Sequence, residues 1–571
     1  MKLIVEKILE FHDLFPEEPD LDIYGVVKQY NKELLVRCAH VLSNNFESPR
    51  IPNYVNPFFS AISQKHMGNI NNRIKRLQKD CKKNSFVYST QRTALELLRI
   101  VFDIAPTDYN NDGKDEDFEF DIFRVILQIN ENLMAFKSRG DLDIATLTYC
   151  SFLISNDFLN FNLQTLLLNQ IYCYLSLSQF LCTDLRCHKA TQMLYAKCGI
   201  TSIHQYARTW LALFSFAYNY RQKGLKQCPI LDLDKLLYDE QFIVTSVLDH
   251  LSLPIEAHIS YTSRDYKDRE NNVDYRCFRA HPLIKISQRQ YLIYSFPILL
   301  ERLYYGMFWD IKDAFNDSFH FYNTEFVERR LFQTQIVENL NLEKSTSFYP
   351  TLDLIRSNTL KEDSNQPDYY IREQDMIVLF ECKAIRINGT IKDKGDINEL
   401  LKIFKGKLYF SDFNIDKTRK NKKSERVGVT QLVHLMKMID EDTFKWDTEI
   451  PDDVAYYPVI VLEDSRLVKP GLTYLINEWY KPLVKEKLPD QMCHPIIVMS
   501  IKTLVIYSEV FKKNGYHKVF DEFFKRNVNY SGIEWQIAYL ADFDSFMSIQ
   551  YEQPKYKLQK RFMESLSILQ S

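Results

Sequence analysis

Glycine is scarce in this sequence, and no long hydrophobic run is unbroken. Fourteen glycines in 571 residues suit long helices better than an all-β protein with many tight turns. The most apolar stretch, 165–181, is interrupted by five polar residues: Asn169, Gln170, Ser176, Ser178 and Gln179. It lacks the roughly 18 unbroken apolar residues of a membrane span. We therefore predict a buried helix there and no membrane partner.

The cysteines follow no regular spacing. Eleven are scattered along the chain, which argues against a disulfide framework. The chain also shows no charged start followed by an apolar stretch and a small-residue cleavage site. We therefore predict a reducing, cytoplasmic location.

Neither sign of charge is in large excess. The chain has 72 Lys and Arg against 75 Asp and Glu, for a net charge of −3. Affinity for nucleic acid would have to come from a local basic face, because the overall charge is slightly acidic. With 46% hydrophobic residues, a chain of this length has enough apolar material for two or three domains.

The spacing of apolar residues divides the chain into four parts. Residues 1–255 repeat apolar positions every three or four residues, which predicts a mostly helical domain of unknown role. Residues 256–320 contain short apolar runs and predict a connecting region with a small strand pair. We expect an α/β domain over 321–505, and helices over 506–571.

Within the α/β part, we expect a hairpin of strands at 367–371 and 376–384. A helix is predicted around 428–440, and further strands near 454–462 and 494–499. Helix, hairpin, helix and strand in this order predict a sheet flanked by helices.

The predicted hairpin, "QPDYYIREQDMIVLFECKA", carries two acids and a lysine around an apolar run. Side chains alternate along a strand, so Glu381 and Lys383 share one face while Cys382 points to the other. Asp368, at the start of the neighbouring antiparallel strand, would then lie beside Glu381. Two carboxylates form a hard oxygen site suited to Mg²⁺, and a lysine close by could orient an attacking water.

This arrangement resembles the active site of the PD-(D/E)XK nuclease superfamily, whose motif is matched by Pro367, Asp368, Glu381 and Lys383. The resemblance implies a restriction-endonuclease-like mixed sheet flanked by helices, following the large helical domain. It also implies that Asp368 and Glu381 bind Mg²⁺, with Mn²⁺ as a substitute, and that Lys383 assists the water. The alternative is a surface hairpin with an ion pair, since similar Asp-x-Lys tripeptides occur elsewhere in the chain.

Two flanking residues extend the resemblance. The family commonly has a glutamine on the helix after the hairpin, where this chain has Gln431, and the amide would position a phosphate. A stricter subgroup has a tyrosine four residues later, where this chain has Leu435. The family also often has a glutamate on the preceding helix; Glu325 and Glu328 share a helix face, and we favour Glu328 as a third metal ligand. The alternative for each is an ordinary polar helix residue.

A basic stretch lies between the hairpin and the predicted helix at 428–440. Residues 381–426 contain 13 Lys or Arg against 7 Asp or Glu. The densest part supplies candidate phosphate contacts: Lys417, Arg419, Lys420, Lys422, Lys423 and Arg426. Such contacts give affinity without sequence preference. The alternative is a solvated charged loop.

Two other sequence motifs are alternative candidates for a metal site. Residues 108–119 match the spacing of an EF-hand calcium loop, with Asp108, Asn110, Asp112, Gly113 and Glu119 at ligand or turn positions. Asp115 stands where an apolar residue is expected, and Pro106 disturbs the entering helix, so an acidic connection is preferred. The cysteines of "CTDLRCH" (182–188) and Cys198 lack paired zinc spacing and are predicted to be buried thiols.

These features predict a Mg²⁺-dependent nuclease that hydrolyses phosphodiester bonds, foremost a DNA endonuclease. By analogy with stand-alone bacterial nucleases, it would serve in defence against foreign DNA. The alternative is a non-catalytic nucleic-acid-binding protein with an idle nuclease-like site, and a third hypothesis is a calcium-responsive regulator. The helical half would then offer a surface for a second copy or a regulatory protein.

Overall fold

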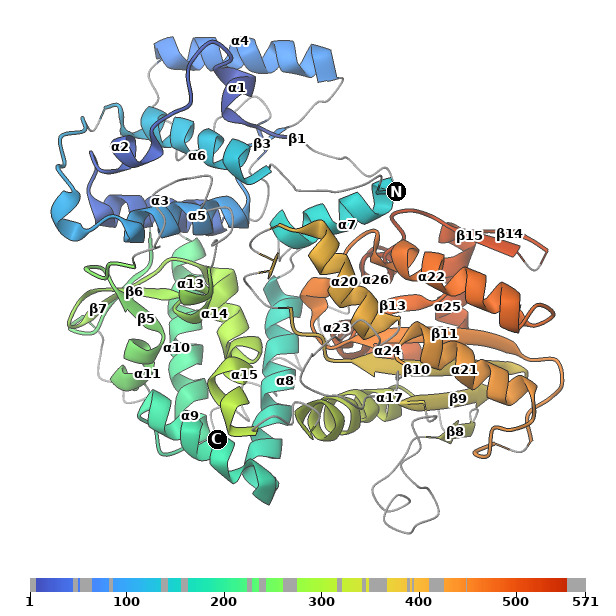
Figure 1. The fold of residues 1–571 in the computed structure, drawn as a ribbon. Coiled ribbons are helices and arrows are strands. Elements are labelled where there is room, and N and C mark those ends of the chain that lie inside the picture. The colour runs from blue at the N-terminus through green and yellow to red at the C-terminus, as the bar shows by residue number, and fades with distance from the viewer. Residues whose placement is uncertain are drawn as a thin grey trace, which may run out of the picture.

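The computed structural model describes residues 7–551 except for a set of internal segments. The described part leaves out 45–49, 52–63, 82–85, 115, 135–141, 156–162, 223–227, 236–242, 260–274, 316–320, 341–345, 349–366, 388–390, 393–394, 410–425, 448 and 533. Figure 1 shows three neighbouring regions: an N-terminal helical part, a helical middle part, and a sheet covered by helices.

The N-terminal part is built around a buried group of helices. Its elements are α1 (Phe11–Leu14), α2 (Ile23–Val27), α3 (Lys32–Asn44), α4 (Gln64–Cys81), α5 (Gln91–Asp103) and α6 (Phe118–Met134), with a small sheet of β1 (Lys7–Ile8), β3 (Phe86–Val87) and β2 (Arg50–Ile51). The apolar residues of α3, α5 and α6 form one hydrophobic core. The predominance of helices that the apolar periodicity predicts is therefore observed in this part of the chain.

The middle part of the chain consists of helices and a small sheet. The helices are α7 (Ile144–Ser155), α8 (Leu163–Thr183), α9 (His188–Cys198), α10 (Ile203–Gln222), α11 (Thr245–His250), α13 (Arg276–Ala280), α14 (Phe296–Leu303) and α15 (Tyr305–Ile311). The sheet has the order β4 (Ile230–Asp232), β7 (Gln290–Ile293), β6 (Leu283–Ser287), β5 (Ser252–Pro254). The antiparallel pair β6–β7 is the strand pair that the sequence predicts.

The apolar stretch at 165–181 forms the buried helix α8, as predicted. Within the part of the chain that the structure describes, no helix is both long and apolar enough to cross a membrane. The described cysteines are all free thiols. Cys187 and Cys198 are buried as predicted, whereas Cys182, at the end of α8, is exposed, so the prediction was wrong for that residue.

The largest sheet is mixed and lies in the second half of the chain. Its strands run in the order β12 (Met492–Cys493), β11 (Ala455–Leu462), β10 (Met376–Lys383), β9 (Tyr369–Glu373), β8 (Thr346–Phe348), and β13 (Ile497–Ser500) also pairs with β11. β10, β11 and β13 are parallel, whereas β8 and β9 are antiparallel to their neighbours. The predicted hairpin and the strands near 454–462 and 494–499 are thus confirmed.

Helices surround this sheet (Figure 1). They are η5 (a π-helix, Tyr322–Phe332), α17 (Gln333–Asn339), α20 (Ile397–Leu408), α21 (Val429–Asp440), α22 (Leu472–Lys487), α23 (Ile501–Ile506), α24 (Ser508–Asn514), α25 (Tyr516–Asn527) and α26 (Phe543–Gln550), with a hairpin of β14 (Val528–Ser531) and β15 (Glu534–Ile537). The fold is therefore α/β in its second half, with a mixed sheet flanked by helices after a mostly helical first half.

One hydrophobic core joins the middle part to the sheet. It includes residues of α8, α10 and α14 together with β10, β11 and the helices after residue 500. The middle helices and the sheet thus share one continuous hydrophobic core. The boundaries at 255, 320 and 505 stay predictions.

The turn before α21 requires glycine. Gly428 has φ +53°, and a Cβ there would lie 2.2 Å from the carbonyl oxygen of Leu408. Because both strain and clash oppose a side chain, Gly428→Ala is expected to lower the free energy of unfolding by about 2 kcal/mol or more. Denaturant unfolding measures it.

Gly68 supplies the matched control for this substitution. It lies in α4, and a Cβ added there would meet no other atom within 4 Å, so Gly68→Ala should stabilise the helix by up to about 1 kcal/mol. Equal effects of the two substitutions would contradict the steric explanation for Gly428.

Candidate active site

The hairpin β9–β10 brings Asp368 next to Glu381. In the ladder, Tyr369 lies opposite Phe380, and the same register, continued by one residue, sets Asp368 opposite Glu381. The regular strand pairing ends one step earlier, at Tyr369 and Phe380. Instead, the Asp368 Oδ2 atom accepts a hydrogen bond from the backbone N–H of Cys382, at 2.6 Å. The carboxylate of Asp368 is therefore held directly against the strand that carries the other two motif residues.

Glu381 and Lys383 form an ion pair on β10. The side chain of Glu381 is fully buried, and that of Lys383 is 21% exposed. Apart from this lysine, the Glu381 carboxylate oxygens have no hydrogen-bond partner among the described residues. The oxygens of a buried carboxylate normally accept hydrogen bonds, so the Glu381 carboxylate can bind an additional cation.

The π-helix η5 adds Glu328 to this group. Glu325, three residues earlier, is engaged elsewhere: it pairs with Arg329 at 2.5 Å and with Arg186 at 3.5 Å. Glu328 instead interacts electrostatically with Asp368 and Lys383. The two glutamates that the sequence placed on one helix face thus have different partners, and Glu328 is the one at the hairpin.

The electrostatics of the group follow from burial and mutual repulsion. Burial is the main cause that raises the carboxyl pKa values of Asp368 and Glu381, and it raises the pKa of Glu328 to about 8. The charge of Asp368 raises the pKa of both glutamates further, whereas Lys383 lowers all three. Burial opposes protonation of Lys383, but the three carboxylates together raise its pKa. Lys383 thus acts on all three acids, and Arg329 acts on Glu328 as well, so the acids outnumber the cations around them.

This charge balance favours a further cation. Carboxylate oxygens are hard ligands, and Mg²⁺ usually takes one or two of them and keeps several waters. The under-bonded carboxylate of Glu381, beside Asp368 and Glu328, fits that requirement. Among the described residues, however, these three acids do not each place an oxygen within 4.8 Å of the other two. The arrangement therefore suits a metal held by a pair of carboxylates and water, rather than a closed three-acid cage.

A more compact group lies in the N-terminal part. His12, Asp20 and Glu131 have ligand atoms within 4.8 Å of one another. His12 Nδ1 lies 2.7 Å from Glu131 Oε1, and the backbone N–H of His12 donates to the same carboxylate. These bonds account for the approach of His12 and Glu131, and Asp20 is exposed, so we assign the group no metal.

Gln431, the predicted phosphate-positioning residue, lies on a helix next to the hairpin. Gln431 is the third residue of α21, is partly buried, and lies on a helix that packs against β10 and α22. Its role in positioning phosphate stays a prediction.

The basic stretch falls mostly outside the described residues. Of its candidate phosphate contacts, Arg426 alone is described; Lys417, Arg419, Lys420, Lys422 and Lys423 are not. Arg426 is exposed. The pKa of His434, in the first turns of α21, is lowered mainly by the burial of His434 and next by the charge of Arg426. Arg426 thus lies beside the start of the helix that carries Gln431.

The loop 108–119 is hydrogen-bonded through its backbone to the two residues that follow α2. The N–H of Asn110 donates to the carbonyl of Lys28 at 3.1 Å, and that of Gly113 to the carbonyl of Gln29 at 2.9 Å. Within the described residues, its acids do not form a compact metal-ligand group. The contacts favour the acidic connection over a calcium loop.

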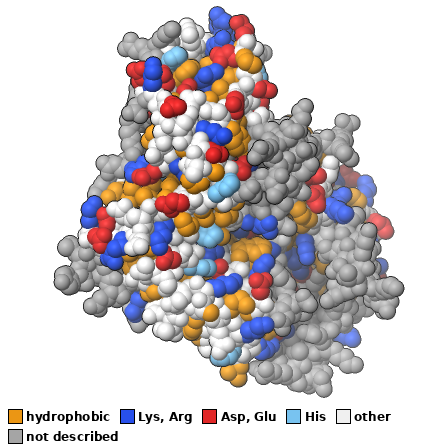
Figure 2. Space-filling view, turned by 60° about the vertical axis from the view of Figure 1, so that its left-hand side comes forward, with side chains coloured by type: hydrophobic (Ala, Val, Ile, Leu, Met, Phe, Trp, Pro, Cys, Tyr) orange, Lys and Arg blue, Asp and Glu red, His pale blue; other side chains and the backbone are white. Residues whose placement is uncertain are grey.

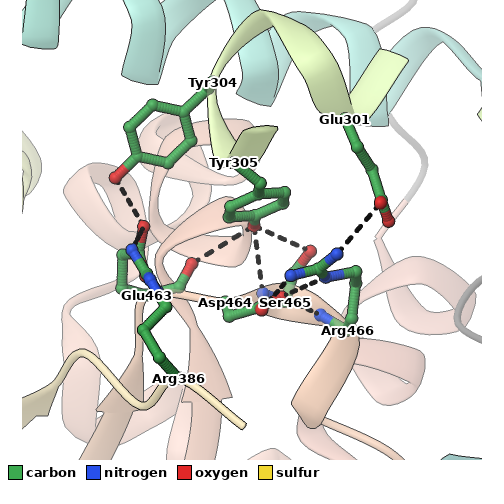
Figure 3. A network of polar contacts seen from close by, with 8 residues as sticks. All are labelled: Glu301, Tyr304, Tyr305, Arg386, Glu463, Asp464, Ser465 and Arg466. Atoms are coloured by element: carbon green, nitrogen blue, oxygen red, sulfur yellow. Dashed lines mark hydrogen bonds and ion pairs between the residues drawn. The ribbon is translucent and has the colours of Figure 1, made fainter. Parts of the chain in front are cut away.

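A buried polar network next to the hairpin was not predicted. Figure 3 shows Glu463, Asp464, Ser465 and Arg466, which follow β11 directly, together with Arg386, Glu301, Tyr304 and Tyr305. The sequence contains a signal for it: four consecutive polar residues, "EDSR", end a buried strand. Polar residues at the carboxyl ends of parallel strands are commonly functional, but their partners come from distant helices.

Comparison of the chain with protein-family models, with curated proteins and with solved structures finds no match.

Proposed function

We propose that this chain is a Mg²⁺-dependent nuclease, foremost a DNA endonuclease. One observation carries the proposal: the Asp368 carboxylate accepts a hydrogen bond from the N–H of Cys382, which lies between the two members of the Glu381–Lys383 ion pair. Glu328, on the helix η5 that packs against β10, interacts electrostatically with this group. A solvated hairpin would leave its acids in water, whereas here Glu381 is fully buried with Lys383 as its ion-pair partner. Burying several like charges together is costly, and such clusters are typical of functional sites.

Each residue has a role in phosphodiester hydrolysis. Asp368 and Glu381 would hold Mg²⁺, with Glu328 beside them. The bound metal would supply an acidified water and compensate the negative charge that develops on the phosphate. Lys383, partly exposed at the end of β10, would orient the attacking water and stabilise the transition state. Gln431 and the basic residues before α21 would contact phosphates.

The surface charge of the N-terminal and middle parts supports nucleic-acid binding at one local face rather than over the whole surface. Figure 2 shows the side of the molecule with the N-terminal and middle parts, where acidic and basic side chains of the described residues are interspersed. That face shows no continuous basic patch in its described portion. We propose that the nucleic acid binds beside the hairpin and the helix α21.

The proposal is tested by incubating the purified protein with linear, circular and single-stranded DNA and with RNA, in Mg²⁺ or in chelator. We expect cleavage of DNA that stops when the metal is removed. Cleavage of circular DNA identifies an endonuclease. Binding that persists in chelator without cleavage in Mg²⁺ would favour the non-catalytic alternative.

A further inference from the structure

The backbone of Lys383 is attached to the residue that follows β11. β10 and β11 are parallel and pair Lys383 with Leu462. Beyond this pair, the N–H of Glu463 donates to the carbonyl of Lys383 at 3.1 Å. The position of the lysine backbone therefore depends on where Glu463 is held.

Glu463 is held by side chains from two directions. Arg386, three residues after Lys383, binds it with both terminal nitrogens, and Nη2 lies 2.9 Å from Oε1. The hydroxyl of Tyr304, at the junction of α14 and α15, donates to the same Oε1 (Figure 3). The side chains of Glu463 and Tyr304 are fully buried, and that of Arg386 is 9% exposed.

A second set of contacts joins the same helices to the next residues. Tyr305 accepts a hydrogen bond from the N–H of Ser465 at 3.1 Å and lies under the guanidinium of Arg466. Arg466 pairs with Asp464 and, at 3.0 Å, with Glu301 of α14. The helical middle part thus contacts the segment after β11 through a hydrogen bond, a cation–π contact and an ion pair.

We propose that Tyr304, Arg386 and Glu463 are positioning residues for Lys383, and that through them the helical middle part holds the nuclease site in its working geometry. This inference rests on the proposed function. The three residues do not touch the reacting atoms; they fix the ends of β10 and β11. A buried polar network whose members are satisfied is rigid, and loss of alignment by about 1 Å can cost on the order of 100-fold in rate.

Tyr304→Phe is the sharpest test, because it removes one hydroxyl and leaves the Arg386–Glu463 ion pair in place. The matched control is Tyr174→Phe. Tyr174 is also fully buried, and its hydroxyl donates to the carbonyl of Ile203 at 2.8 Å, within the middle part. Each variant loses one buried hydroxyl donor, so a general loss of stability should affect both alike.

Two readouts separate positioning from stability. We expect Tyr304→Phe to lower kcat on DNA about 10-fold with KM unchanged, and to speed amide hydrogen exchange in the peptide spanning 382–386. Tyr174→Phe should change neither. Wild-type kcat and exchange in Tyr304→Phe, or equal losses in both variants, would overturn the inference.

The exchange readout also separates this inference from the proposed function. Wild-type protein that cleaves nothing in Mg²⁺ would refute the nuclease. In that case, faster exchange at 382–386 in Tyr304→Phe alone would still show that the network holds Lys383, and unchanged exchange would refute the network as well.

Discussion

Lys383→Ala is expected to abolish metal-dependent cleavage, with a loss of at least about 100-fold in kcat. Removing a single group that stabilises the charge of the transition state commonly costs 10²–10³-fold. Here the same lysine also compensates the charges of Glu328, Asp368 and Glu381. The measurement is the initial rate of DNA cleavage at saturating Mg²⁺, beside a binding assay in chelator. DNA binding should largely persist, because the phosphate contacts are predicted to lie on other residues.

The effect on folding has to be separated from the effect on catalysis. Without Lys383, the buried carboxylate of Glu381 loses its ion-pair partner. Protonation can relieve this, because burial already raises the pKa of Glu381. We therefore expect the variant to remain folded, and unfolding in denaturant verifies that before rates are compared. Asp368→Ala should likewise lose cleavage while the protein remains folded.

Lys485→Ala is the matched control for Lys383→Ala. Lys485 pairs with Glu534 at 3.1 Å, but the two side chains are 76% and 66% exposed. An exposed pair contributes little to stability, and this one lies away from the hairpin, so cleavage should continue at the wild-type rate. Wild-type cleavage by Lys383→Ala would remove the lysine from the mechanism.

Arg386→Met is expected to lower the free energy of unfolding by about 3–5 kcal/mol. Breaking a buried ion pair from one side leaves an uncompensated charge, which is among the most costly single substitutions. Glu463 is fully buried, and Arg386 is its ion-pair partner. Denaturant unfolding, followed by fluorescence and by circular dichroism, measures the change.

The double variant Arg386→Met with Glu463→Met should recover much of this loss. Replacing both partners of a buried pair by apolar residues is often neutral or stabilising. Arg289→Met is a control, because Arg289 pairs with Asp234 at 2.5 Å but both side chains are more than half exposed; its cost should stay below about 1 kcal/mol. A cost for Arg386→Met as small as that of Arg289→Met would show that the buried pair contributes little.

The hairpin could be predicted from the sequence because its signals are local. A continuous apolar run, a short polar turn and strand alternation together define β9, β10 and the relation of Glu381 to Lys383. The same locality explains the success at α8, α21 and β11, where the apolar pattern has the length and period of one element. Pattern alone therefore placed Glu381 and Lys383 on the correct strand, whereas Asp368, expected within the first strand, lies one residue before β9.

The choice between Glu325 and Glu328 could not be made from the residues near them in the sequence. Both glutamates satisfy helical spacing. They differ in their partners, because Glu325 pairs with Arg186 and Arg329. Glu328 interacts with Asp368. Residue 186 lies on a different helical segment, and no period in the sequence records that contact.

By itself, then, the sequence determined the α/β order of the second half, the helical first half and the hairpin with Asp368, Glu381 and Lys383, because period, turn and alternation act between near neighbours. The tertiary structure decided that Glu328 joins this group, that Glu381 is fully buried, and that Tyr304 reaches Glu463 across 159 positions of the chain. Burial and electrostatic coupling depend on which distant segments pack together, and the hydrophobic core shared by the middle helices and the sheet sets that packing.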